Sequence, residues 1–221
     1  MSEERRLLVE TAHQVFGRPG VDAWREVDKA GLADLGTDAD LADVAAVIRV
    51  SAYEGTDIDF AERVMPELGD PQRRGALMRA IQIVGALERV RDLTVAYAAE
   101  RRQFGQPLNR FQAVQQMLAE LAGEVALAAA AVETAVADPL SAKLVASAKV
   151  AAGGAAGRGA AIAHQVHGAI GFTHEHQLHR WTTKLWAWRD EFGTESAWAE
   201  ALGDLVARAV ADRLWEVVTG E

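Results

Sequence analysis

The chain has 221 residues, half of them apolar and 25% charged, which is the composition of a globular protein with a substantial core. The formal net charge of −9 and the lack of a basic face argue against a nucleic-acid partner held by phosphate contacts. The absence of cysteine excludes disulfides and zinc–thiolate sites. The charged start and the lack of an apolar run of about 18 residues predict neither a signal peptide nor a membrane span. We therefore expect a cytoplasmic protein.

The periodicity of apolar residues is helical almost throughout. Stripes that begin at Leu7 and Leu41 predict two short helices in the first third, with loops over 17–20 and 31–40. Asp70 followed by Pro71 is typical of a helix start, because aspartate caps the first turn and proline fits its first position.

Three long helices are expected after residue 70. The first carries an apolar stripe over 77–97 and should end near Phe104, where glycine follows. Asn109 is expected to cap the second, which should end at Asp138, and Ser141 to cap the third, which should run to His167. Two more helices are predicted over 175–188 and 195–218, and strands should be few or none.

Residues 121–160 are rich in alanine and include Gly153, Gly154, Gly157 and Gly159. This composition favours a closely packed helix face, because small side chains let backbones approach. A phosphate-binding glycine loop is the weaker interpretation, since no strand precedes these glycines.

Two polar segments offer the chemistry of a dinucleotide site. The first, over 101–112, combines Arg101, two amides, Phe104 and Gly105 at the junction of two predicted helices. Arginine suits a pyrophosphate and phenylalanine a planar ring, although by composition alone a charged helix end with a capped turn is the commoner explanation. The second runs from Gln165 through Gly168 to Thr173, with Gly171 and Phe172 before its end.

Together the two segments closely resemble the C-terminal helical domain of flavin-dependent acyl-CoA dehydrogenases, over about residues 70–205. The resemblance implies an all-α fold, with a four-helix up-down bundle over 70–221 and a reduced helical segment over 1–69. Ala169 stands where the family has a second glycine. An alanine there permits a backbone contact if its φ is negative. The residues to which the resemblance gives FAD contacts are Arg101, Gln103, Phe104, Gln112, Gln165, Gly168 and Ala169.

The resemblance also implies that this chain carries no catalytic residue. The family's base is the glutamate of a Tyr-Glu-Gly-Thr stretch, and here Phe192 takes its place in Glu191-Phe192-Gly193-Thr194. The alternative base position of the family falls near Gly75. Neither residue can accept a proton. Between residues 33 and 70 there is room only for short helices, so the β-domain that holds the flavin ring in the family has no counterpart there.

In the family, FAD is shared between one subunit's β-domain and a neighbour's helical bundle. We therefore predict the small subunit of a heteromeric FAD-dependent acyl-CoA dehydrogenase, which desaturates an acyl-CoA thioester. A partner subunit would supply the β-domain and the base, and the bundle would support a homodimer. Heteromeric bacterial members act on bulky esters such as steroid side chains. The alternatives are a catalytically silent helical scaffold and a stand-alone flavin- or nucleotide-binding protein.

Five of the six histidines lie close together, which raises a metal site as a further alternative. Two pairs are one helical turn apart, and Glu175 could join them. Because the same stretch fits the flavin motif without a metal, no metal is expected. The histidines are His164, His167, His174, His176 and His179.

Overall fold

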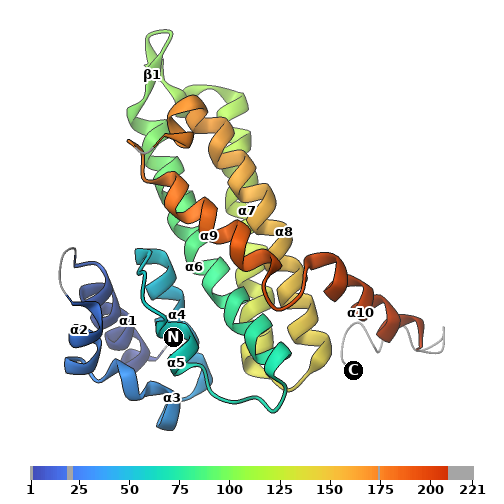
Figure 1. The fold of residues 1–221 in the computed structure, drawn as a ribbon. Helices are drawn as coiled ribbons and strands as arrows, with labels where there is room; N and C mark the ends of the chain where they lie inside the picture. Colours follow the sequence, from blue (N-terminus) through green and yellow to red (C-terminus); the bar gives the residue numbers. More distant parts are fainter. Residues whose placement is uncertain (1, 19–21, 174, 209–221) are drawn as a thin grey trace.

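A computed structural model describes residues 2–18, 22–173 and 175–208, and they are helical almost throughout (Figure 1). The N-terminal segment holds α1 (Glu3–Phe16), α2 (Ala23–Lys29), η1 (Leu32–Asp34), α3 (Leu35–Asp38), α4 (Leu41–Glu54) and α5 (Phe60–Val64). The bundle helices are α6 (Pro71–Glu100), α7 (Gln112–Ala137), α8 (Ala142–His167) and α9 (Leu178–Asp190). Between and after them come β1 (Arg102–Gln103), β2 (Gln106–Pro107), η2 (Leu108–Arg110), η3 (Gly168–Phe172) and α10 (Glu195–Ala207). The predicted all-α bundle is confirmed.

The two strongest helix-start signals in the sequence are correct. The Asp70 carboxylate accepts hydrogen bonds from the backbone N–H groups of Gln72 and Arg73, at 2.9 and 3.2 Å. The Ser141 hydroxyl accepts from the N–H of Leu144 at the start of α8. Both side chains satisfy N–H groups that have no partner within their own helix.

Four predicted boundaries are wrong. Helix α6 ends at Glu100, before Phe104, because the next residues pair as an antiparallel hairpin. Asn109 does not cap α7; it lies in η2, and the N-cap residue Phe111 offers no side-chain bond. The predicted loop over 31–40 contains η1 and α3, and α9 begins at Leu178. Helix α10 ends at Ala207, and the rest of its predicted span, from 209, lies outside the described residues.

One hydrophobic core runs from the N-terminal segment into the bundle. It includes Phe60 of α5, Ile48 of α4, Leu87 of α6 and Leu121 of α7. Gly159 of α8 lies against Leu87, where a Cβ would come within 2.7 Å of the leucine side chain. This contact bears out the packing interpretation of the small residues in α8. The division of the chain at residue 70 stays a sequence-based interpretation.

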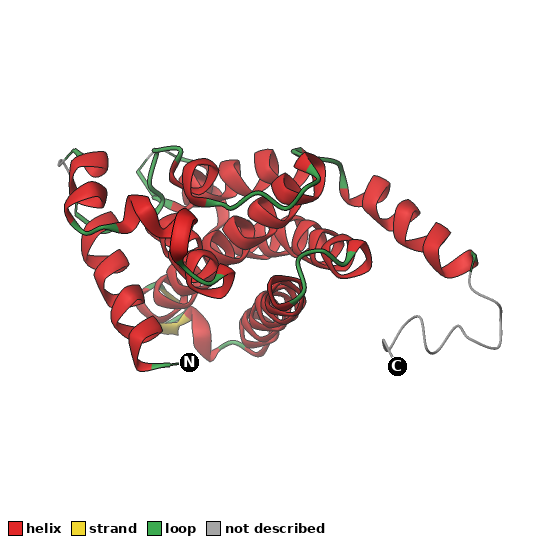
Figure 2. Ribbon diagram, turned by 90° about the horizontal axis from the view of Figure 1, so that it is seen from below, coloured by secondary structure: helices red, strands yellow, loops and turns green. Residues whose placement is uncertain are grey.

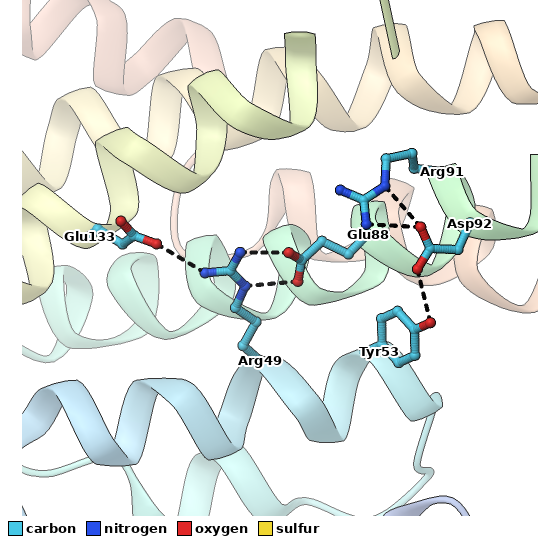
Figure 3. Close-up of polar contacts among 6 residues, drawn as sticks. All are labelled: Arg49, Tyr53, Glu88, Arg91, Asp92 and Glu133. Carbon is cyan, nitrogen blue, oxygen red and sulfur yellow. Dashed lines mark hydrogen bonds and ion pairs between the residues drawn. The ribbon is translucent and has the colours of Figure 1, made fainter. Parts of the chain in front are cut away.

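Polar contacts bind α4 to the bundle beside this core (Figure 3). The Arg49 guanidinium of α4 donates to both carboxylate oxygens of Glu88 on α6, at 2.5 and 2.7 Å, and to Glu133 on α7 at 3.2 Å. One turn further along α4, the Tyr53 hydroxyl donates to Asp92 at 2.9 Å. The bidentate geometry fixes the orientation of the arginine.

Helix α10 projects from the body of the molecule (Figures 1 and 2). It has no buried residue of its own, although Trp198 packs against the core. In the described part of the chain, no helix has the length and apolarity needed to cross a membrane.

Candidate functional site

The two predicted FAD-facing segments lie at the same end of the bundle, where α6 leads into the hairpin and α8 ends (Figure 1). Tyr97, in the last turn of α6, donates a hydrogen bond from its hydroxyl to the carbonyl oxygen of His167, the last residue of α8, at 3.3 Å. The fold therefore brings together two segments that are far apart in the sequence.

The first segment presents an exposed aromatic ring on a tight turn. Phe104 and Gly105 have φ values of 49° and 82°, and they connect β1 to β2. Positive φ at both central residues matches the hairpin turn whose twist suits antiparallel strands. Phe104 is 92% exposed, and Arg101 and Gln103 on either side of the strand start are also exposed. Within the described chain the Phe104 ring meets the Phe111 ring edge-on, with 6.3 Å between centroids, and most of its surface is left open to a ligand.

Gln112 completes the first segment as the opening residue of α7. It is exposed, and the first turn of α7 has no side-chain cap. The N–H groups of an uncapped first turn favour negative charge. Together with the Arg101 guanidinium and the Phe104 ring, this end offers contacts that fit the ADP half of a dinucleotide.

The second segment leaves α8 at a glycine that the backbone conformation requires. Gly168 has φ 64° and ψ −147°, and a Cβ there would meet no atom within 4 Å, so conformation and not space selects glycine. Ala169 is not among the described residues with positive φ, so alanine fits there without backbone strain. Gln165, Gly168 and Ala169 are all exposed. Ala169 therefore meets the condition for a backbone contact with FAD, which is a negative φ.

Buried histidines lie beneath this second segment. His167 is 4% exposed, its Nδ1 bonds to the carbonyl of Ala163 at 2.8 Å, and its ring stacks on Tyr97 at 4.3 Å. His164 is 7% exposed and stacks on Phe172 at 4.1 Å. The described residues contain no group of three or more histidine, cysteine or carboxylate side chains that could hold a metal ion. His174, part of the metal alternative, lies outside the described residues.

Acid should destabilise the fold through these histidines. Burial lowers the pKa of His167 to about 4 and also lowers the pKa of His164. Below the ordinary value of about 6.5, the unfolded chain binds a proton at His167 that the native chain does not bind until about pH 4. The free energy of unfolding should therefore fall by about 2–3 kcal/mol between pH 6.5 and 4. Urea titrations across this range check it, and a His167→Phe variant with the same pH dependence would contradict it.

The two positions to which the resemblance assigns the family's base, at Phe192 and near Gly75, lie in direct contact. The ring of Phe192 fills the space above Gly75, and a Cβ on that glycine would overlap the ring. Phe192 has φ 55° and is 41% exposed. Both positions therefore belong to one small region of the structure, and neither carries a carboxylate.

The neighbouring Glu191 is held in an ion pair. Its carboxylate accepts from Nε of Arg79 on α6 at 2.7 Å, and Arg79 also pairs with Glu62 at 2.7 Å. Lys149 of α8 binds the end of α9, directly before the turn that carries Phe192. It is fully buried, and its Nζ donates to the carbonyls of Trp188 and Arg189 at 2.9 and 2.7 Å. The composition of α8 gives no signal for this buried lysine.

A cleft of about 830 Å³ lies away from both regions, between α1, α4, α6 and α7. Its lining includes Arg49, Tyr53 and Glu88, and it contains none of the predicted FAD-contact residues and neither base position (Figure 3). The cleft and the predicted FAD site are therefore different places, because the predicted site is an exposed surface at one end of the bundle.

The fold is an all-helical bundle, and the two segments to which FAD contacts are assigned are exposed at one end of it. Over residues 73–212 the sequence matches the family model described as "Acyl-CoA dehydrogenase, C-terminal domain". The chain belongs to the acyl-CoA dehydrogenase family, whose members are oxidoreductases that act on CH–CH groups.

The chain is similar to named members of this family. It is 40% identical over 114 residues to acyl-CoA dehydrogenase IpdE2 of Mycolicibacterium smegmatis, and 38% identical over 121 residues to IpdE2 of Mycobacterium tuberculosis. These matches cover 50% and 54% of this chain, but only 36% and 38% of the two relatives. The chain thus matches somewhat more than a third of the length of these curated relatives.

Solved structures match the chain over different shares of their length. A glutaryl-coenzyme A dehydrogenase complexed with glutaryl-CoA is 29% identical, with a TM-score of 0.58 over 60% of this chain and 35% of that one. The ChsE4–ChsE5 complex from Mycobacterium tuberculosis gives a TM-score of 0.82 over 96% of this chain and 99% of that one, at 16% identity. The second match shows that the whole arrangement of helices, N-terminal segment included, recurs in another protein.

Proposed function

We propose that this chain is the small subunit of a heteromeric FAD-dependent acyl-CoA dehydrogenase. It contributes contacts to the ADP side of FAD, and a partner subunit contributes the β-domain and the catalytic base. FAD in this family accepts the hydride when an acyl-CoA thioester is desaturated. The proposal is supported by the contact between Phe192 and Gly75: neither position assigned to the base carries a carboxylate, while Arg101 and Gln165 at the end of the bundle are exposed.

The internal architecture supports a division of labour. Between α2 and α6 the described chain has only helices and their connections, and the only strands in the described residues are the two of the hairpin. A flavin ring in the family rests on a β-domain, so the partner has to provide that support. The partner proposed is therefore an acyl-CoA dehydrogenase subunit that has both a β-domain and a base.

Purification with and without a partner tests this proposal. Alone, the chain should be a colourless helical oligomer, most simply a homodimer formed through the bundle. Co-expression with a genetically neighbouring acyl-CoA dehydrogenase should give a yellow complex that oxidises an acyl-CoA. Stoichiometric FAD and acyl-CoA oxidation in the isolated chain would refute the heteromer, and a colourless, inactive complex would favour the silent scaffold.

Arg101→Ala should weaken FAD retention in the partnered complex without unfolding the isolated chain. Arg101 is exposed and pairs with no carboxylate in the described chain, so its loss removes little from the fold. A charged hydrogen bond to phosphate contributes about 1.5–3 kcal/mol, so the FAD dissociation constant should rise by about one to two decades. Absorbance of FAD after gel filtration measures retention. Arg6→Ala is the control and should retain FAD as the wild type does, because Arg6 is an exposed arginine of α1 that pairs with Glu10.

Phe192→Glu should not produce dehydrogenase activity in the isolated chain. A carboxylate there would restore a candidate base, but proton removal needs an acyl chain and a flavin ring held in line with it. Turnover of an acyl-CoA with an artificial electron acceptor measures this, after circular dichroism has shown that the variant folds. Turnover by the single chain would mean that the active site is complete here.

A further inference from the structure

One residue contacts both of the segments to which FAD contacts are assigned, the first through its backbone and the second through its side chain. The Tyr97 carbonyl accepts from the N–H of Arg101, the first residue of the hairpin segment, at 2.8 Å. The Tyr97 hydroxyl donates to the carbonyl of His167, directly before Gly168, and its ring stacks on the His167 ring at 4.3 Å and 22°. Tyr97 is half-buried and is the one aromatic residue of α6, and it lies in the last turn of that helix before the hairpin.

His167 is held from several sides. Its Nδ1–H donates to the Ala163 carbonyl, which leaves the lone pair on Nε2. That Nε2 is buried and has no hydrogen-bond partner in the structure. The edge of the ring meets His176, whose centroid lies 4.5 Å away. A ring with this much contact has little freedom to rotate, so the carbonyl that follows it is also fixed.

The peptide after His167 sets the direction of the second segment. The Gly168 N–H closes α8 by donating to the His164 carbonyl, while φ of 64° turns the chain out of the helix. A hydrogen bond to the His167 carbonyl therefore acts at the point where the chain changes direction. Loss of that bond should loosen the turn and leave the rest of α8 intact.

We propose that Tyr97 and His167 are positioning residues for FAD: the pair fixes the turn at Gly168 relative to the turn at Phe104 and Gly105. Neither residue belongs to the segments' predicted FAD contacts, and the pair acts through the backbone of those segments. The inference rests on the proposed function for its ligand, but the geometry of the pair can be tested without FAD.

The pair works with a neutral imidazole. The groups that face His167 are Tyr97 on α6, His164 on α8 and His176 after η3, with His179 next to His176. In the described part of the chain no carboxylate hydrogen-bonds or ion-pairs with His167. A proton on Nε2 would be buried without an acceptor, so acid should open the contact.

The first experiment measures amide hydrogen exchange in the full chain without FAD. Tyr97→Phe should lower the protection of the Gly168 amide about 3- to 10-fold, since it removes one hydrogen bond. Tyr53→Phe is the matched control, because the other tyrosine of the chain bonds to Asp92 between α4 and α6. The amide of Ala128, buried in α7, reports global opening. Equal protection of Gly168 in the two tyrosine variants would overturn the proposal.

The same measurement as a function of pH separates positioning from general packing. In the wild type, the protection of Gly168, corrected for intrinsic exchange and compared with Ala128, should fall below about pH 5. His167→Phe keeps a ring for the stack but has no nitrogen to protonate, so its relative protection should not change with pH. A persistent pH dependence in His167→Phe would overturn the role of this histidine.

The second experiment measures FAD dissociation from the partnered complex. Tyr97→Phe should raise the dissociation constant about 3- to 10-fold, with no such change in Tyr53→Phe. If the wild-type complex binds FAD and both variants bind it equally, positioning is refuted and the proposed function stands. If the wild-type complex binds no FAD, the proposed function fails, and FAD positioning fails with it.

Discussion

Gly85→Ala is expected to lower the free energy of unfolding by about 3–5 kcal/mol, or to prevent folding. Gly85 lies on α6 where α4 crosses it, and a Cβ there would overlap the carbonyl oxygen of Arg49 and lie 2.9 Å from its carbonyl carbon. The obstacle is backbone, which cannot rotate away as a side chain can. Relief requires α4 to move, and with it the Arg49–Glu88 ion pair (Figure 3).

Gly123→Ala is the control for this prediction. Gly123 lies within α7, and a Cβ there would meet nothing within 4 Å. Alanine in place of an exposed helical glycine should stabilise the fold by about 0.5–1 kcal/mol. Urea unfolding followed by circular dichroism measures both variants. If Gly85→Ala is as stable as the wild type, α4 does not pack on α6 as described, and the N-terminal segment is not anchored to the bundle here.

Lys149→Ala is expected to cost about 3–5 kcal/mol of unfolding free energy. The substitution removes a fully buried side chain and the donor to two carbonyls at the end of α9, those of Trp188 and Arg189. The last carbonyls of a helix have no partner within it, so both would lose a hydrogen bond in a buried place. The cavity left by the side chain adds to the loss.

Two further lysine variants separate these contributions. Lys149→Met keeps most of the volume, so the difference between the methionine and alanine variants reports the cavity. Lys29→Ala, at a side chain that is 57% exposed and pairs with Glu26, should stay within about 0.5 kcal/mol of the wild type. Thermal or urea unfolding checks all three. Wild-type stability in Lys149→Ala would show that α9 does not depend on this lysine.

Lys149 also lies close to Phe192, the position that the resemblance assigns to the base. Burial lowers the pKa of Lys149 to about 8, because the charged form loses solvation in the interior. The two carbonyls that it binds lie directly before the turn that carries Phe192. Lys149 therefore supports the turn on which the position assigned to the base lies.

Local sequence signals predicted the helices well and their ends unevenly. Asp70 and Ser141 were correct because a cap is a local device: the side chain bonds to N–H groups two or three residues away. The predicted cap at Asn109 is wrong because that residue lies within η2, which precedes α7. Phe104 was expected at the end of α6, whereas pairing of Gln103 with Gln106 ends the helix earlier. A two-residue strand is too short to leave a periodic signal.

For the candidate site too, some features could be predicted from the sequence and others could not. The sequence by itself determined the family, and through the resemblance it predicted FAD contacts at Arg101 and Gln165 and a missing base at Phe192, because these depend on residue type at motif spacing. Only the tertiary structure decided that Phe192 lies on Gly75 and that Tyr97 joins both segments through His167. Such contacts link residues some 70 to 120 positions apart, and no local pattern encodes which helix faces meet. These contacts follow from packing of the bundle core, which brings the C-terminal ends of α6 and α8 together.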